Sequence, residues 1–254
     1  MFLAVDIGNS NVTLGVFDGE TLGVHMRFAA NPAGTADEYG IAMISSLQRA
    51  GITTGNIRTI AIGSVVPELT HVFVEACVNY MLCEPFVADA AMRTGLRSMY
   101  DDPSQLGVDR ILDAAAAYKL YGGPACVTDF GTATTFDAVS SNGRYLGGAI
   151  VPGIGIAAEG LFQSASKLPK VDYKRPERVI GRSVRQSLQS GILYGYTGLV
   201  EGLICRFRAE LGTEMKVVAT GGFAEIIAAE TDVINILAPW LMLDGLRIIY
   251  HMNT

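Results

Sequence analysis

Two stretches of the chain follow one pattern: FLAVDIGNSNVTLGVFDG at residues 2–19 and ACVTDFGTATTFDAVSSNG at residues 125–143. Each begins with an apolar run that ends in Asp-x-Gly and continues through small polar residues into a second apolar run. Each closes on Asp-Gly or Asn-Gly, which is typical of the turn of a β-hairpin. Each stretch therefore predicts a strand, a polar turn and a returning strand that enters a further hairpin.

The shared order of residues favours a duplication over two unrelated hairpins. The alignment places Asp6 on Asp129, Gly8 on Gly131 and Asn11 on Thr134. Its offset of 123 residues is close to half of the 254-residue chain. We therefore expect two similar α/β lobes, residues 1–121 and residues 122–254.

The remaining sequence alternates between periods typical of helices and of short strands. We expect helices at residues 35–50, 67–82, 109–121, 154–165, 183–211, from 223 onward and 240–250, and strands at residues 57–64, 85–88 and 216–219. Two of these helices start with the spacing of a capping box, Thr35 with Glu38 and Ser183 with Gln186.

The long helix expected at residues 183–211 carries glycines on one face, namely Gly191, Gly195, Gly198 and Gly202. A glycine inside a helix costs about 1 kcal/mol relative to alanine, so we expect another element to approach this face closely. Packing inside the lobe and contact with a second subunit both explain such a face, and the sequence does not separate them.

The composition excludes several classes of protein. With 50% hydrophobic and 17% charged residues the chain is not disordered, and its net charge of −6 argues against nucleic acid as the main partner. The four cysteines form no Cys-x-x-Cys pair and lie far from the histidines in sequence, so we expect neither zinc nor a disulfide framework. The sequence shows no basic leader and no apolar run of about 18 residues, so we expect a cytoplasmic protein without a membrane span.

The first Asp-x-Gly turn suits phosphate binding. A glycine among small polar residues exposes backbone N–H groups to an anion, and Asp6 at the strand end could hold Mg²⁺ directly or through water. The glycine patterns of the P-loop and of the Rossmann fingerprint are both missing from this segment. Taken alone, a plain hairpin whose buried Asp6 is satisfied by turn amides explains the segment better.

Two further glycine turns follow expected strands in the second half. Gly131 is surrounded by three threonines, which suits a second hairpin that contacts phosphate. Thr220-Gly221-Gly222 lies between an expected strand and an expected helix, where the backbone could form a flat surface for an adenosine. Gly-Gly by itself is only a common turn.

Gly107-Val108-Asp109-Arg110 opens the helix expected at residues 109–121. Asp109 could accept a proton from an attacking hydroxyl, and Arg110 could bind a carboxylate or phosphate in a bidentate manner. For an isolated Asp-Arg pair, an acid favoured by the helix dipole beside a surface ion pair is the simpler explanation.

Together these motifs closely resemble those of the type III pantothenate kinases, a family of the actin-like ATPase and sugar kinase superfamily. The resemblance runs nearly end to end and includes TADEYG at 35–40, SVVP at 64–67, GGAI at 147–150, PG at 152–153 and KLP at 167–169. It implies an α/β fold of two similar actin-like (ribonuclease H-like) lobes, each a mixed sheet flanked by helices, with a nucleotide cleft between them. It further implies ATP-dependent phosphorylation of pantothenate to 4′-phosphopantothenate, the first step of coenzyme A biosynthesis. The family works as a homodimer and needs Mg²⁺ and a monovalent cation, K⁺ or NH₄⁺.

The resemblance also implies roles for individual residues. Asp109 matches the general base, and Asp129 matches the K⁺ ligand. The matched ATP and phosphate contacts are Asp6, Ile7, Gly8, Asn9, Ser10, Asn11, Val12, Thr13 and Thr132. The matched pantothenate contacts are Tyr100, Gly107, Val108, Asp109 and Arg110, with Val184 at the position where the family has threonine.

Four positions depart from the family pattern. Val184 fills the volume of the usual threonine but cannot hydrogen-bond to the substrate, a loss of about 1–3 kcal/mol for a buried polar atom. Asp102 and Asp113 stand where the family usually has asparagine, and Ser10 replaces a threonine but keeps a hydroxyl. The departures on the substrate side keep two alternatives open: a non-catalytic nucleotide-binding regulatory protein, and a kinase for a different small hydroxyl substrate.

Overall fold

The computed structural model describes residues 1–89 and 91–254. Its contacts divide the chain into two units. The first contains Met1–Leu96, Asp101–Ala116 and Leu241–Thr254, and the second contains Arg97–Tyr100 and Ala117–Trp240. These units differ from the expected division at Tyr121 because the last helix packs on the first sheet and a short strand at Arg97–Ser98 pairs with the second sheet.

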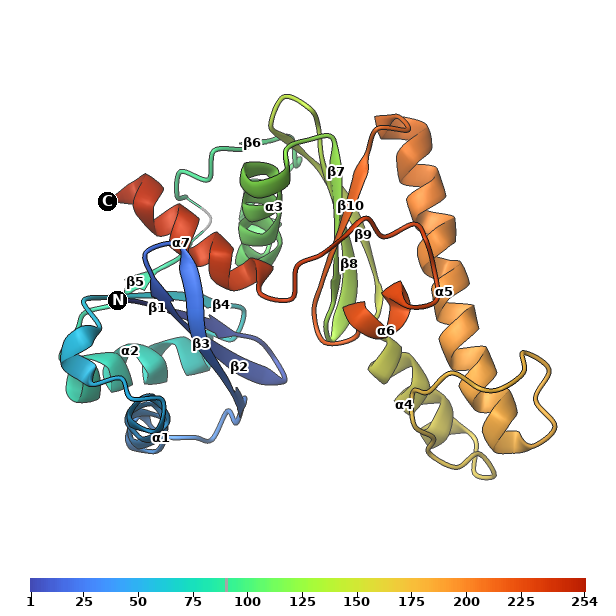
Figure 1. Cartoon of the computed structure of the whole chain (residues 1–254), viewed down its shortest axis with the longest axis horizontal. Helices are drawn as coiled ribbons and strands as arrows, with labels where there is room; N and C mark the ends of the chain where they lie inside the picture. Colours follow the sequence, from blue (N-terminus) through green and yellow to red (C-terminus); the bar gives the residue numbers. More distant parts are fainter. Residues whose placement is uncertain (90) are drawn as a thin grey trace. The chain divides into compact units, whose positions relative to one another are not determined.

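The first unit is built on a five-stranded mixed sheet in the order β3-β2-β1-β4-β5 (Figure 1). Its strands are β1 (Phe2–Ile7), β2 (Asn11–Asp18), β3 (Thr21–Ala29), β4 (Thr59–Ser64) and β5 (Phe86–Val87). β2 is antiparallel to both β1 and β3, whereas β4 is parallel to both β1 and β5.

Side chains on neighbouring positions of a strand point to opposite faces of this sheet, and their size determines which helices pack on each face. The large side chains form a core with α1 (Ala36–Arg49) and α2 (Pro67–Met81), and include Leu3, Val5, Ile7, Leu14, Ile60 and Ile62. Two glycines lie on the other face, where a Cβ on Gly15 would meet Leu243 and one on Gly63 would meet Met242 and Leu112. These glycines therefore admit α7 (Leu241–Asn253) and α3 (Val108–Tyr121) close to the sheet.

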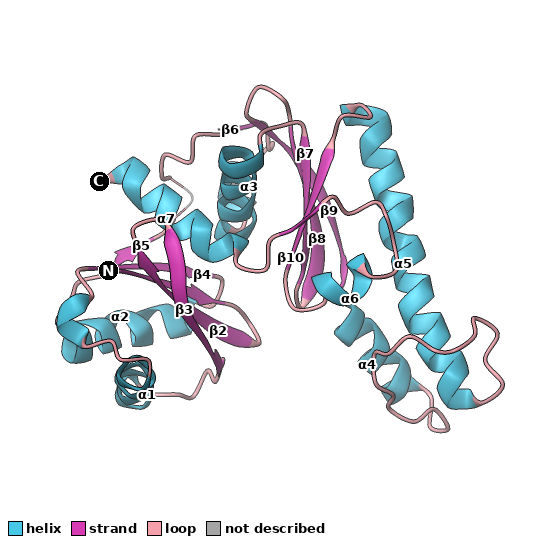
Figure 2. Ribbon diagram, in the orientation of Figure 1, coloured by secondary structure: helices cyan, strands magenta, loops and turns pink. Residues whose placement is uncertain are grey.

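The second unit repeats this topology in a six-stranded sheet, in the order β11-β10-β7-β8-β9-β6 (Figure 2). Its strands are β6 (Arg97–Ser98), β7 (Ala125–Phe130), β8 (Ala133–Val139), β9 (Arg144–Pro152), β10 (Lys216–Thr220) and β11 (Ile236–Leu237). β8 is antiparallel to both β7 and β9, whereas β10 is parallel to both β7 and β11. Apart from β6, the order and sense of the strands are those of the first unit, which confirms the predicted α/β class with two similar lobes.

The two Asp-x-Gly turns differ in length by one residue. Pairing resumes from Ile7 to Val12 in the first hairpin and from Phe130 to Thr134 in the second. Val12, not Asn11, is therefore the structural equivalent of Thr134. The sequence alignment of Asn11 with Thr134 is wrong by one position, because the length difference lies in the turn itself.

Helices α4 (Ile154–Ser164), α5 (Val184–Leu211) and α6 (Ala224–Ala228) complete the second unit. The buried face of α5 packs on Phe130 and Phe136 through Tyr196, Val200 and Ile204. Short 3-10 turns lie at Thr54–Asn56 and Pro103–Gln105. Within the described residues, no helix combines the length and apolar character needed to cross a membrane.

Of the two predicted capping boxes, the one at α1 is complete and the one at α5 is formed only in part. Thr35 and Glu38 form the predicted capping box at α1. At α5, the Ser183 hydroxyl accepts a hydrogen bond from the Gln186 N–H (3.3 Å), but the Gln186 side chain accepts from the Arg182 N–H instead (2.9 Å). The second half of that predicted box is therefore shifted by one residue.

Candidate active site

The first Asp-x-Gly turn lies at the end of β1. Asp6 is the register partner of Thr13 on β2 and of Gly63 on β4, and it is partly exposed. The Gly8 N–H donates to the Asn11 carbonyl (3.0 Å) and closes the turn, so this donor does not point to a ligand as the sequence had suggested. The exposed residues at the tip of the turn are Asn9, Ser10 and Asn11.

Two of the matched ATP contacts lie inside the core of the first unit. Ile7 and Val12 have no exposed side-chain surface and belong to the apolar cluster beneath α1 and α2. Their positions limit any contact with a nucleotide to backbone atoms. Thr13 is also buried, at 8% exposure.

The second Asp-x-Gly turn is enclosed by a glycine from another segment. The Gly131 N–H donates to the Ala133 carbonyl (3.1 Å), as Gly8 does in the first turn, and the Gly153 N–H donates to the Thr132 carbonyl (3.0 Å). A Cβ at Gly153 would collide with the carbonyls of Gly131 and Thr132, so only glycine fits there. The Thr132 side chain remains exposed at the tip.

The Thr220-Gly221-Gly222 turn meets the same hairpin at Asp129. Thr220 is the register partner of Asp129 between β10 and β7. Gly221 has a φ of +89°, and a Cβ there would collide with the Asp129 carboxylate and with the backbone of Phe130. The two glycine motifs predicted for the second lobe therefore converge on one site within that unit.

Asp6 and Asp129 are the carboxylates expected to hold cations. Three or more His, Cys, Asp or Glu side chains do not cluster in a metal-binding arrangement anywhere in the described part of the chain. Proteins commonly hold Mg²⁺ through one or two carboxylates together with substrate phosphates. Because Gly221 has no side chain, its backbone lies close to the Asp129 carboxylate. Carboxylate oxygens and backbone carbonyl oxygens are both ligands of hard cations.

The proposed base lies in the first turn of α3. The Asp109 carboxylate accepts a hydrogen bond from the Arg110 N–H (2.8 Å) and lies against Gly107, where a Cβ would be 2.5 Å from Oδ1. Gly107 therefore leaves room for this carboxylate. Arg110 is only 7% exposed, so a surface ion pair does not describe the Asp-Arg motif.

α3 lies against the strand that neighbours Asp6. Leu112 is one turn beyond Asp109, and its Cδ1 lies 3.1 Å from the position of a Cβ on Gly63. Gly63 is the register partner of Asp6. Because register partners point to the same face, the Asp6 side chain lies on the face of the sheet that α3 contacts through Leu112.

The matched pantothenate contacts come from both units. Tyr100 belongs to the second unit, and Gly107–Arg110 belongs to the first. Between them, Asp102 caps a 3-10 turn by accepting hydrogen bonds from the Ser104 hydroxyl (2.7 Å) and the Ser104 N–H (3.0 Å). Both bonds hold the pKa of Asp102 below its usual value, and the bond from the Ser104 hydroxyl has the larger effect. Aspartate at this departure from the family pattern therefore has a local structural role.

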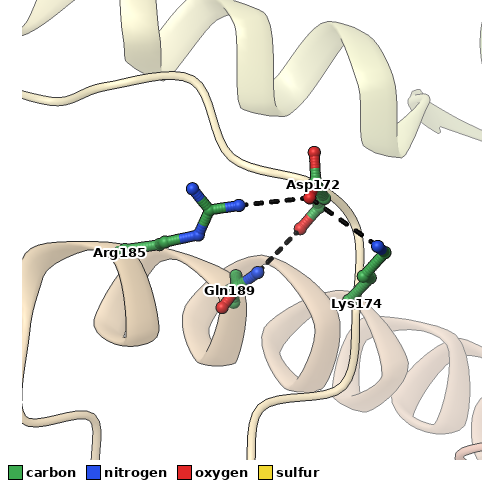
Figure 3. A network of polar contacts seen from close by, with 4 residues as sticks. All are labelled: Asp172, Lys174, Arg185 and Gln189. Atoms are coloured by element: carbon green, nitrogen blue, oxygen red, sulfur yellow. Dashed lines mark hydrogen bonds and ion pairs between the residues drawn. The ribbon is translucent and has the colours of Figure 1, made fainter.

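Val184 is the first residue of α5 and is 52% exposed. It lines a cavity of about 610 Å³ together with Leu168, Gly181, Arg182, Ser183, Ser187 and Leu188. Figure 3 shows how the loop before α5 is held: Asp172 accepts a hydrogen bond from Arg185 (3.1 Å), and its carbonyl accepts one from Gln189 (3.3 Å). Lys174 lies at 3.9 Å from the same carboxylate. Val184 is therefore not a core residue and faces open space.

The glycine face of α5 is open in this chain. Among the residues that the structure describes, a Cβ on Gly191, Gly195 or Gly198 would meet nothing within 4 Å beyond the helix's own nearby backbone. Gly191 and Gly195 line an apolar groove of about 440 Å³ between α4 and α5. Packing inside the lobe therefore does not account for these glycines.

No motif of the sequence pointed to Tyr196, a residue that supports the second hairpin. Tyr196 is 7% exposed, and its hydroxyl hydrogen-bonds to Thr134 Oγ1 (2.7 Å) and to the Pro152 carbonyl (2.9 Å). Burial raises the pKa of this hydroxyl. A tyrosine on the apolar face of a helix looks the same in sequence whether it only packs or also holds a turn.

Comparisons with known proteins agree with the motifs. The family model described as Type III pantothenate kinase matches residues 2–206. The type III pantothenate kinase of Moorella thermoacetica is 47% identical over 254 residues, which covers 100% of both chains. The enzyme of that name from Roseiflexus castenholzii is 48% identical over 253 residues, covering 100% of this chain and 99% of the relative.

Solved structures share the fold at low identity. A conserved protein from Campylobacter jejuni, described as a Baf family transcriptional activator, superposes with a TM-score of 0.63 at 21% identity, covering 99% and 98% of the two chains. A ROK family glucokinase from Streptomyces griseus, in complex with glucose and AMPPNP, superposes with a TM-score of 0.52 at 11% identity, covering 98% and 99%. These similarities establish the fold alone. On the family model and the full-length relatives, the chain belongs to the type III pantothenate kinase family.

Proposed function

We propose that the chain transfers the γ-phosphoryl group of ATP to the primary hydroxyl of pantothenate, the first step of coenzyme A biosynthesis. The observation that carries this proposal is the full-length identity of 41–49% to relatives named type III pantothenate kinase. The three aspartates that the chemistry needs are also present at the ends of their elements. Asp6 lies near the end of β1, Asp109 in the first turn of α3 and Asp129 near the end of β7.

Asp109 is proposed as the general base. Phosphoryl transfer depends more on alignment and charge neutralisation than on covalent chemistry of the protein. The hydrogen bond from the Arg110 N–H fixes one oxygen of the Asp109 carboxylate, so the other can accept the proton of the substrate hydroxyl. Arg110 is proposed to bind the carboxylate of pantothenate, and Tyr100, Gly107, Val108 and Val184 are proposed to complete its site.

The hairpin turns are proposed to bind the phosphates of ATP. Backbone N–H groups at the exposed tip of the first turn, residues 9–11, and the Thr132 hydroxyl of the second can donate to phosphate oxygens. Asp6 is proposed to hold Mg²⁺, directly or through water, and Asp129 to hold K⁺ or NH₄⁺. When bound, these cations supply positive charge beside the phosphates.

We further propose a homodimer that forms through the groove between α4 and α5. Exposed apolar side chains occur on α4, with Ile156 at 52% and Leu161 at 42% exposure, beside the open glycines of α5. Glycines without a partner inside the chain permit close approach of a second copy. The proposed location is the cytoplasm, where thiols stay reduced: all four cysteines are free, and burial raises the pKa of Cys77 and Cys126 to about 12.

The test is an assay of ADP release from ATP in the presence of Mg²⁺ and K⁺, with and without pantothenate. We expect ADP release that depends on pantothenate. ATP binding without turnover would support the regulatory alternative instead. ADP release with another small hydroxyl compound, but not with pantothenate, would support the alternative of a different substrate.

A further inference from the structure

We propose that Asp137 and Tyr145 are positioning residues that hold Tyr100 in place for pantothenate. This inference rests on the proposed function, because the resemblance alone gives Tyr100 its role as a substrate contact. All three residues lie in the second unit, so their geometry does not depend on the arrangement of the two units.

The first observation is a buried carboxylate with two donors. Asp137 on β8 is 1% exposed, and burying a carboxylate is costly unless hydrogen bonds compensate. Its Oδ1 accepts a bond from the Tyr145 hydroxyl at 2.6 Å, and its Oδ2 accepts one from the Thr135 hydroxyl at 3.0 Å. The short bond to Oδ1 orients the ring of Tyr145.

The second observation is that Tyr145 contacts the segment of Tyr100 through both ring and backbone. The two rings lie 6.1 Å apart between centroids at 51°, within the usual range for aromatic pairs. β6 pairs with β9 at Ser98 and Tyr145, and the Met99 N–H donates to the Tyr145 carbonyl at 2.8 Å. Tyr145 is fully buried, so it forms a rigid support beneath the partly exposed Tyr100.

The third observation is the backbone beside Tyr100. Gly147 has a φ of +112°, and a Cβ there would lie 3.7 Å from the Tyr100 ring. The Tyr100 N–H donates to the Ser98 hydroxyl at 3.2 Å, which fixes the chain on its other side. The ring of Tyr100 therefore lies against the Tyr145 ring and close to the β9 backbone at Gly147.

The hydrogen bonds of Asp137 also link the second Asp-x-Gly hairpin to the support of Tyr100. Thr135 belongs to the second Asp-x-Gly hairpin, and it shares the Asp137 carboxylate with the support of Tyr100. Asp137 thus joins Thr135, in the hairpin whose turn carries the proposed ATP contact Thr132, to Tyr145, which supports the tyrosine proposed to contact pantothenate. Because this role concerns position, loss of the Tyr145 hydroxyl should weaken pantothenate binding more than ATP binding.

The test is a double-mutant cycle with Tyr145→Phe and Tyr100→Ala, measured as KM for each substrate, kcat and Tm. We expect Tyr145→Phe to raise the pantothenate KM about three- to tenfold and to leave the ATP KM within about twofold. In the Tyr100→Ala background, Tyr145→Phe should have little further effect, because the residue that it positions is absent. Tyr118→Phe is the matched control, since its hydroxyl bonds to the Ser141 carbonyl (3.4 Å) near the far end of the β8–β9 hairpin.

Three results would overturn this inference. The first is a lower Tm in Tyr145→Phe without a change in the pantothenate KM. The second is an equal rise in both KM values, and the third is an equal effect of Tyr145→Phe in the Tyr100→Ala background. Hydrogen exchange tests the inference even if the parent does not phosphorylate pantothenate. We expect faster exchange at Met99 and Tyr100 in Tyr145→Phe than in Tyr118→Phe, and equal exchange in the two variants would contradict the positioning role.

Discussion

Asp109 gains its proposed chemical role from the point at which its helix begins. The Arg110 N–H in the first turn of α3 donates to its carboxylate, and Gly107 leaves the space that the carboxylate occupies. The neighbouring Arg110 is buried, which a solvent-exposed ion pair would not require. In an exposed loop, an Asp-Arg dipeptide would have neither a fixed carboxylate nor a buried arginine.

Asp109→Asn should lower turnover about 10²–10⁴-fold, the usual contribution of a general base. Asparagine keeps an oxygen that can accept the Arg110 N–H, so Tm and ATP affinity should stay close to those of the parent. Steady-state kinetics measures turnover, and calorimetry measures the affinity for ATP. Asp101→Asn, which removes the charge of an exposed aspartate, is the control. Turnover within a few-fold of the parent would exclude Asp109 as the base.

Val184→Thr should lower the pantothenate KM about three- to tenfold and leave the ATP KM unchanged. A neutral hydrogen bond contributes about 0.5–1.5 kcal/mol, and threonine restores the hydroxyl that the family has at this position. Because Val184 is 52% exposed, Tm should change little. Val179→Thr, at 66% exposure in the preceding loop, is the matched control. An unchanged pantothenate KM would show that this position does not contact the substrate.

Asp129→Asn should weaken the dependence of the rate on K⁺ or NH₄⁺. The substitution removes the negative charge beside Gly221 and keeps the size of the side chain. Rates are compared in potassium and sodium buffers, with the exposed Asp18→Asn at the end of β2 as control. If the parent turns over equally fast in both buffers, the assignment of a K⁺ site is wrong.

At the scale of elements, local patterns predicted most of the fold. Thr35 and Glu38 marked the start of α1, and the Asp-x-Gly repeat marked two hairpins that the sheet topology confirms. What the sequence could not show depends on contacts between distant segments. The length of each turn follows from strand register, and the enclosure of the second turn by Gly153 and Gly221 follows from β9 and β10.

The same distinction applies to the candidate site. Resemblance supplied the residues, but only the structure separates the buried Ile7 and Val12 from the exposed tip of the first turn. Tyr196 could not be found from sequence because its role depends on a hydroxyl that meets β8 and β9 from a distant helix.

Tyr196→Phe should destabilise the second unit by about 1–3 kcal/mol. It leaves the buried Thr134 hydroxyl and the Pro152 carbonyl without their shared partner. Denaturant unfolding measures the change, and Tyr194→Phe, a neighbour on the same helix, is the control. Equal stability of the two variants would mean that the Tyr196 hydroxyl does not hold α5 to the hairpin.

At the scale of the whole molecule, the open glycine face of α5 predicts a homodimer. Gly195→Glu should give a folded monomer, because a Cβ at this position meets no described atom within 4 Å and the new carboxylate places charge in the proposed interface. Light scattering at micromolar concentration measures the mass. Gly55→Glu, at another glycine where a Cβ meets nothing, is the control and should remain dimeric. A monomeric parent would refute the proposed dimer.

The central claim is that this chain phosphorylates pantothenate with ATP. The most direct measurement uses ATP labelled with ¹⁸O in its γ-phosphate and identifies the labelled product by mass spectrometry. We predict that the label appears in 4′-phosphopantothenate in equal amount to the ADP released, and that Asp109→Asn greatly slows its formation. Label found only in inorganic phosphate, or ADP formed at the same rate without pantothenate, would contradict the account.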